Sequence, residues 1–148
     1  MIEIIKMEEC HVFAVAEMEK QFFSSPWSEN SVRSELHNPL SLWLVAIDGE
    51  TVCGYIGSQT AAGETDVMNL AVLPDYRRSG LGRRLTEALI VRLREQGSAA
   101  VLLEVRESNA PAISLYEKAG FHTVGIRPNY YFKPKENAII MRKELMEA

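Results

Sequence analysis

Apolar residues follow a helical spacing in two long stretches of the chain. Residues 8–23 place valine, alanine and phenylalanine on one face, and residues 82–96 do the same with leucine and alanine. Glu19 is the only polar residue on the apolar face of the first stretch. Gly97 follows the second stretch, where glycine commonly ends a helix. The pattern therefore predicts two amphipathic helices.

Two shorter helices are predicted from capping signals. Ser28 can cap a helix that ends before Asn38, because the residue before a proline disfavours helix. Asn109 and Pro111 form a cap and first-turn pair, and Gly120 closes the helix that they open.

Runs of apolar and β-branched residues predict about seven strands. The dipeptide Asp48-Gly49 is a strong hairpin signal inside the stretch 42–59. Antiparallel strands come first and strand–helix alternation follows, which predicts an α/β (α+β mixed) fold with about four helices on both faces of a mixed sheet. The expected strands are residues 2–6, the two arms of 42–59, and residues 66–72, 100–105, 121–127 and 138–143.

Composition favours one intracellular domain. The 148 residues are 47% hydrophobic, enough for one core, so we expect a single domain over residues 1–148. Cys10 and Cys53 lack metal or disulfide spacing, which suits a reducing cytosol. The chain starts with acidic residues and has no apolar run of membrane-spanning length, so we expect a cytoplasmic protein with no membrane partner. A net charge of −4 argues against direct nucleic-acid binding.

The stretch RRSGLGRRL, residues 77–85, is a local exception to the acidic charge. A loop that leaves a strand at Val72 and enters a helix near Gly82 exposes backbone N–H groups, which can hold a pyrophosphate. Leu85 stands where a nicotinamide fingerprint needs a third glycine, and the lysine of a nucleotide-triphosphate loop is missing. The alternative is an arginine-rich helix start that binds no ligand.

The wider stretch NLAVLPDYRRSGLGRRL, residues 69–85, resembles the acetyl-CoA-binding segment of the GCN5-related N-acetyltransferase superfamily. Arg77, Gly80 and Gly82 match its motif. The resemblance implies acetyl-CoA as co-substrate, no metal, and direct attack by the acceptor in a ternary complex. The coenzyme contacts that it implies are Leu70, Ala71, Val72, Arg77, Arg78, Ser79, Gly80, Leu81, Gly82, Arg83 and Asn109.

Three further segments resemble the RimI-type branch of this superfamily. They are PWSENSVRSEL at residues 26–36, LLEVRESNAPAISLYEKAGF at residues 102–121, and RPNYY at residues 127–131. The branch acetylates the N-terminal alanine of a small-subunit ribosomal protein, so the resemblance implies a ribosomal-protein N-terminal peptide as partner. The alternative acceptors are other protein N-termini, lysine or a small-molecule amine.

Glu104 is the candidate proton acceptor. It ends the buried strand 100–105, where a mixed sheet offers its ligand crevice, and the resemblance assigns the base to this position. The alternative is a strand-end carboxylate paired with Arg106 or Arg127. Glu64 and Asp66 precede a neighbouring strand and are kept as alternative bases.

Tyr116 is the candidate proton donor. It follows Asn109 by two helical turns, so both side chains can face one groove. The resemblance assigns Tyr116 to protonate the coenzyme thiolate, and it implies that a strand carrying Leu70 and Val72 splays away and offers a free N–H as oxyanion donor. The alternatives are a packing aromatic at Tyr116 and a simple helix cap at Asn109.

Tyr130 and Tyr131, with Arg127, are expected to form the acceptor side. The alternative is a solvent-facing hairpin tip. The family usually has Glu-Asp before the last strand where this chain has Glu136-Asn137, which bears on acceptor specificity. Three histidines show no metal spacing, and they are His11, His37 and His122.

Two functions from other classes compete with an enzyme. A non-catalytic acetyl-CoA sensor would need neither Glu104 nor Tyr116. An RNA-contacting module would use the arginines, and its RNA affinity would depend steeply on salt.

Overall fold

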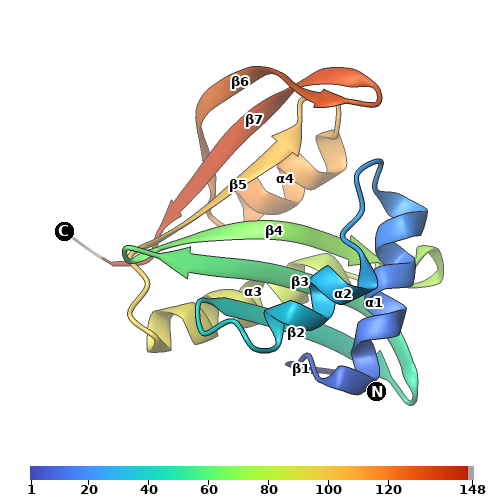
Figure 1. Cartoon of the computed structure of the whole chain (residues 1–148). Helices are drawn as coiled ribbons and strands as arrows, with labels where there is room; N and C mark the ends of the chain where they lie inside the picture. The colour runs from blue at the N-terminus through green and yellow to red at the C-terminus, as the bar shows by residue number, and fades with distance from the viewer. Residues whose placement is uncertain (147–148) are drawn as a thin grey trace.

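The computed structural model describes residues 1–146, in which all strands join one seven-stranded sheet of order β1-β2-β3-β4-β5-β7-β6 (Figure 1). The strands are β1 (Ile2–Lys6), β2 (Ser41–Asp48), β3 (Thr51–Ala61), β4 (Glu64–Val72), β5 (Ala100–Arg106), β6 (His122–Phe132) and β7 (Lys135–Glu144). The helices are α1 (Glu9–Phe22), α2 (Glu29–Glu35), α3 (Leu81–Glu95) and α4 (Ala110–Lys118), with a short 3-10 turn η1 (Pro74–Tyr76) before α3.

The predicted mixed α/β fold is confirmed, and the differences lie at element ends. β6 was expected to stop at Arg127, before Pro128, but it continues to Phe132. The pairing of β6 with β7 is interrupted between Arg127 and Tyr131, so Pro128, which lacks an N–H, lies in a bulge. The turn η1 was not predicted.

Helices cover both faces of the sheet (Figure 1). Side chains of β2 and β3 alternate between two apolar clusters, as the pleat of a strand requires. Leu44 and Ile56 pack with the α3 and α4 side, whereas Val45 and Tyr55 pack with α1 and α2. Among residues 1–146, no helix has the length and apolar character needed to cross a bilayer.

Strands β4 and β5 form the single parallel pair of this sheet, and they pair over a short length. The partners are Glu64–Asp66 of β4 and Ala100–Leu102 of β5, after which β5 continues beside β7. Met68 is an extra residue in β4, because Gly57 pairs with Asn69 while Ser58 pairs with Val67. A bulge bends its strand, and Figure 1 shows the two strands diverging beyond their shared start.

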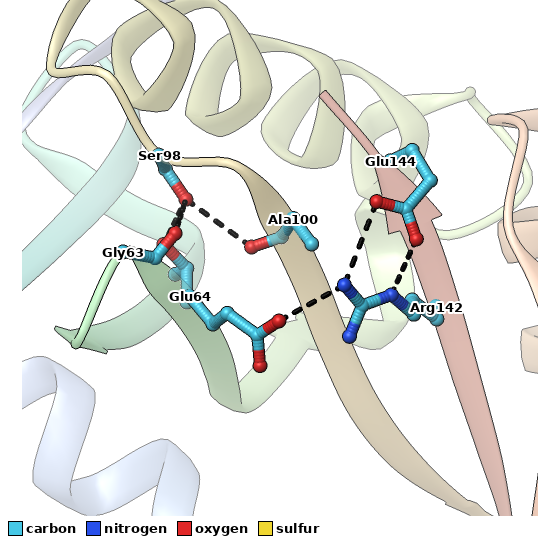
Figure 2. A network of polar contacts seen from close by, with 7 residues as sticks. Gly63, Glu64, Ser98, Ala100, Arg142 and Glu144 are labelled. Atoms are coloured by element: carbon cyan, nitrogen blue, oxygen red, sulfur yellow. Dashed lines mark hydrogen bonds and ion pairs between the residues drawn. The ribbon is translucent and has the colours of Figure 1, made fainter. Parts of the chain in front are cut away.

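We call the divergence of β4 and β5 the splay, and its closed end is the part where the two strands still pair. A polar network joins β4, β5 and β7 at this closed end (Figure 2). Arg142 of β7 pairs with Glu64 of β4 at 2.9 Å and with Glu144 on its own strand. Ser98, which is buried, donates to the Ala100 carbonyl at 3.1 Å and shares a hydrogen bond with the Thr65 hydroxyl. These contacts fix the strands together at one end while the other end stays open.

Candidate active site

A cavity of about 660 Å³ lies between η1, the start of α3 and α4. We call it the donor cavity. Many of the expected coenzyme contacts line it, as do residues of α4. Its lining residues are Val72, Tyr76, Arg77, Arg78, Gly80, Leu81, Gly82, Arg83, Asn109, Pro111, Ala112 and Leu115.

The start of α3 presents free backbone donors to this cavity. Gly80 caps the helix with φ of +81°, a conformation that favours glycine. The first bond of the helix runs from Arg84 N–H to the Gly80 carbonyl, so the three preceding N–H groups have no carbonyl within the helix. A Cβ on Gly82 would meet Leu115 Cδ1 at 3.0 Å, which shows how closely α4 approaches the backbone. An anion such as a pyrophosphate fits these donors and the helix dipole.

The arginines of this segment differ in their partners. Arg77 Nε donates to the Val72 carbonyl at 2.9 Å, and its guanidinium lies 4.8 Å from the Phe22 ring centroid. Arg83 pairs with Glu87 at 2.6 Å. Arg78 makes no side-chain hydrogen bond within residues 1–146 and lines the donor cavity, so its charge is available to a ligand.

Three expected contacts, Leu70, Ala71 and Ser79, do not line the donor cavity, and Ala71 and Ser79 line neither cavity. The Ser79 hydroxyl donates to the Tyr76 carbonyl. Ala71 faces the α1 side of the sheet, opposite to its neighbours Leu70 and Val72. The backbone of Ser79 and Ala71 can still contact the coenzyme, but their side chains do not line the cavity.

A second cavity of about 380 Å³ occupies the gap between β4 and β5. We call it the reaction groove. It brings together six of the expected site residues, which are Glu104, Tyr116, Asn109, Leu70, Tyr130 and Tyr131. The remaining lining residues are Phe22, Phe23, Val67, Met68, Asn69, Leu103, Val105, Arg106 and Ala112.

Glu104 stands in the reaction groove with a loose ion pair. Its Oε1 lies 3.6 Å from Arg127 Nε, and its side chain keeps 30% of its exposure. Arg106, the other partner considered, bonds instead to Glu136 at 3.2 Å and to the Pro134 carbonyl. The carboxylate therefore remains open to a ligand in the groove.

Tyr116 is only 6% exposed and packs edge-on against Phe121, with ring centroids 5.5 Å apart. Burial raises the pKa of the Tyr116 hydroxyl above its ordinary value, and the nearby Tyr131 raises it further. The phenol therefore keeps its proton at neutral pH. Asn109 caps α4 through its Oδ1, which accepts from Ala112 N–H at 3.2 Å, and it also lines both cavities.

Aromatic rings and arginines form the wall at the β6–β7 tip. Tyr130 and Tyr131 meet edge to face at 5.1 Å, and the Arg106 guanidinium stacks 4.2 Å from the Tyr131 ring. Arg127 lies 5.7 Å from the Tyr130 ring. Burial raises the pKa of Tyr131 to about 12, and Tyr130 and Glu104 reinforce the shift.

The departure at Glu136-Asn137 preserves local contacts. Asn137 Oδ1 accepts from the Asn129 N–H at 2.9 Å, a role that an aspartate oxygen would also fill. Glu136 accepts from the Ser108 N–H and from Arg106, and these bonds lower its pKa. Position 137 therefore still supplies a side-chain acceptor, with one negative charge fewer than the family pattern.

Several residues considered from sequence lie outside both cavities. Glu64 is ion-paired at the closed end of the splay, and Asp66 is exposed on β4 just before it diverges. Neither lines the reaction groove. His11 accepts from the Glu8 N–H through Nδ1 and caps α1.

Sequence reasoning missed one buried cluster beside the groove. Glu19 is fully buried, and its carboxylate accepts from Asn69, which lines the groove, and from Tyr55 and the Trp27 N–H. The signal was present, because Glu19 interrupts the apolar face of α1, but its partners come from distant parts of the chain.

The splayed sheet, the anion site at α3 and the paired cavities define an acyl-CoA-dependent acyltransferase fold. The family model described as "Acetyltransferase (GNAT) family" matches residues 12–121, and the chain belongs to this family.

Relatives and solved structures share most of the chain. This chain is 39% identical to the [ribosomal protein bS18]-alanine N-acetyltransferase of Haemophilus influenzae, over 93% of this chain and 95% of that protein. The ribosomal-protein-S18-alanine N-acetyltransferase from Escherichia coli superposes with a TM-score of 0.90 at 37% identity, covering 100% and 96% of the two chains. Ard1 from Thermoplasma volcanium superposes with a TM-score of 0.88 at 26% identity, covering 99% of each chain.

Proposed function

We propose that this chain transfers the acetyl group of acetyl-CoA to the N-terminal α-amine of an alanine on a small-subunit ribosomal protein. The observation that carries the proposal is the reaction groove, where Glu104 and Tyr116 line one cavity between diverging strands. The names of the relatives from Haemophilus influenzae and Escherichia coli support the acceptor. We place the reaction in the cytoplasm, where ribosomal proteins are made, in one catalytic domain over residues 1–148.

Acetyl-CoA enters from the α3 side. Its pyrophosphate would accept from the free N–H groups at the start of α3 and pair with Arg78. Asn109 lines both cavities, so the arm that carries the thioester can pass it on the way into the reaction groove.

The open edge of β4 supplies oxyanion donors. Leu73 N–H donates to the Cys53 carbonyl of β3 at 2.9 Å. Because the direction of backbone N–H groups alternates along a strand, those of Leu70 and Val72 point away from β3 and towards the gap. Either can stabilise charge on the thioester oxygen during attack.

Proton transfer needs two groups. The α-amine first loses a proton to Glu104. The neutral nitrogen then attacks the acetyl carbonyl carbon, the new C–N bond forms, and the next proton that the nitrogen loses replaces the one that Tyr116 gives away. The C–S bond then breaks, and Tyr116 donates its proton to the departing sulfur. A peptide α-amine has a pKa of about 7.7 to 8.0, far below about 10.4 for lysine, so it is the easier nucleophile near neutral pH.

Mass spectrometry of acceptor peptides tests the proposal. The enzyme and acetyl-CoA are incubated with bS18 N-terminal peptides that begin with alanine, serine or a blocked alanine, and fragmentation locates the acetyl group. We expect acetylation of the alanine α-amine and none of the blocked peptide. Acetylation confined to lysine side chains, or to small amines, would instead indicate one of the alternative acceptors.

A further inference from the structure

Glu19 is a buried carboxylate that joins four segments. Its oxygens accept from Tyr55 of β3, from the Trp27 N–H at 3.0 Å and from Asn69 Nδ2 at 3.0 and 2.9 Å. All of these donors are neutral, and Glu19 has no cationic partner within residues 1–146. A buried carboxyl group needs its hydrogen bonds supplied from inside the protein, and these donors supply them.

Asn69 turns its amide nitrogen towards Glu19, which leaves Asn69 Oδ1 on the other side. This oxygen has no hydrogen-bond partner within residues 1–146. In the same part of the chain, no side-chain oxygen that is fully buried lacks a partner, so Asn69 Oδ1 is open to solvent. Asn69 lines the reaction groove, and its side chain lies on the α1 face of β4, away from the donor cavity.

We propose that Glu19 is a positioning residue for the acceptor, since it holds the Asn69 amide with its oxygen towards the groove. That oxygen accepts a hydrogen bond from an N–H of the first residues of the acceptor. The same carboxylate fixes the Trp27 backbone, and with it the chain between α1 and α2. This inference rests on the proposed function, because it requires an amine acceptor in this groove.

The location of Asn69 favours the acceptor over acetyl-CoA. It neighbours Met68, the bulge residue, and shares the groove wall with Phe22 and Phe23 at the end of α1. The donor cavity lies on the α3 and α4 side and does not include Asn69. A ligand that reaches Asn69 Oδ1 therefore comes from the face opposite to the coenzyme.

The Glu19→Gln variant changes the polarity of this contact. Its amide keeps one oxygen and replaces the other by NH₂, so at most one of the two bonds from Asn69 Nδ2 remains and the Asn69 amide is held less firmly. We expect the acceptor-peptide KM to rise about tenfold, with kcat and the acetyl-CoA dissociation constant changed less than about threefold. Asn69→Leu removes the oxygen and should raise the acceptor KM similarly.

A double variant separates positioning from general stability. If Glu19 acts through Asn69, then Glu19→Gln together with Asn69→Leu should have the acceptor KM of Asn69→Leu alone. Glu35→Gln is the matched control: Glu35 is also buried and accepts from Trp43 at 3.2 Å and Gln59 at 2.7 Å, but it lies outside the groove. Its acceptor KM should stay at the wild-type value.

The outcomes are distinguishable. An unchanged acceptor KM in Asn69→Leu, or additive effects in the double variant, would overturn the role of Glu19, even if Glu19→Gln itself folds poorly. If either of these results is found while the wild-type enzyme acetylates peptide N-termini in the mass-spectrometry assay, the role of Glu19 is rejected and the proposed function stands. A wild-type enzyme that acetylates no peptide would overturn the proposed function and this inference with it.

Discussion

Asp66 of β4 pairs with Leu102 of β5, and beyond this pair the two strands separate. Glu104 lies only two residues further along β5, so the separation places its carboxylate at the edge of the gap. On the β4 side, the same separation leaves the edge beyond Asp66 without a β5 partner. One break in the pairing thus provides both the proposed base and the proposed oxyanion donors.

Tyr116→Phe should separate binding from chemistry. The change keeps the ring, its packing against Phe121 and the shape of α4, and it removes only the proton. General acid catalysis is commonly worth about 100- to 10,000-fold, so we expect kcat to fall within that range. The acetyl-CoA dissociation constant, measured by calorimetry, should change less than about threefold. A wild-type rate under conditions where chemistry limits would leave Tyr116 a packing residue.

The raised pKa of Tyr116 has a consequence for the pH profile. A phenol with a raised pKa stays protonated to higher pH than a free tyrosine, whose pKa is about 10. The acid form is therefore present throughout the neutral and mildly alkaline range. We expect kcat of the folded enzyme to show no alkaline decline below pH of about 10, and a decline centred near pH 8 would point to another acid.

Glu104→Gln should lose activity in a way that pH partly repairs. The amide cannot accept the proton, so kcat/KM for the peptide should fall strongly near pH 7. As pH rises through about 8, the α-amine loses its own proton and needs the base less, so the ratio of wild-type to variant rates should shrink. A ratio that stays constant from pH 6.5 to 9 would reject this assignment.

Gly82 offers a test of the donor cavity with a matched control. Gly82→Asp puts a carboxylate beside the expected phosphate site and should weaken acetyl-CoA binding by at least about tenfold. Gly82→Ala adds only a Cβ, which meets the mobile end of Leu115 at 3.0 Å, and should have a much smaller effect. Equal losses of acetyl-CoA and peptide binding in the aspartate variant would indicate unfolding instead.

The closed end of the splay should matter for stability more than for chemistry. Ser98→Ala removes a buried hydroxyl that bonds to Thr65 and to the Ala100 carbonyl, so we expect about 1–3 kcal/mol less stability. Glu64→Gln breaks an exposed ion pair with Arg142 and should reduce stability much less, because exposed ion pairs contribute little. Urea unfolding measures both. A Ser98→Ala enzyme with lost kcat at 25 °C would show that this end affects the groove.

The elements could be predicted because their signals are local. Ser28 caps α2 through its hydroxyl, which accepts from Ser31 N–H at 3.1 Å, and Asn109 caps α4, as their positions predicted. The grouping of Glu104 and Tyr116 was also predicted, since strand ends and helix faces follow from periodicity together with the family resemblance.

The features that escaped prediction depend on contacts between distant segments. The bulge at Met68 can be recognised only when β3 and β4 are aligned, because no residue type near it indicates a bulge. The Glu19 cluster joins residues up to 50 positions apart, from Glu19 to Asn69. A lone polar residue on an apolar helix face signals a buried bond, but the sequence does not name its partner.

In the proposed reaction, donor and acceptor meet in one groove, from opposite faces, in a ternary complex. A conjugate that joins the CoA sulfur through an acetyl linker to the α-amine of an alanine peptide must occupy both sides at once. We predict that it competes with acetyl-CoA and with peptide, and that it binds at least about tenfold more tightly than either alone. A conjugate that competes only with acetyl-CoA, with the affinity of CoA itself, would show that the two substrates do not meet in this groove.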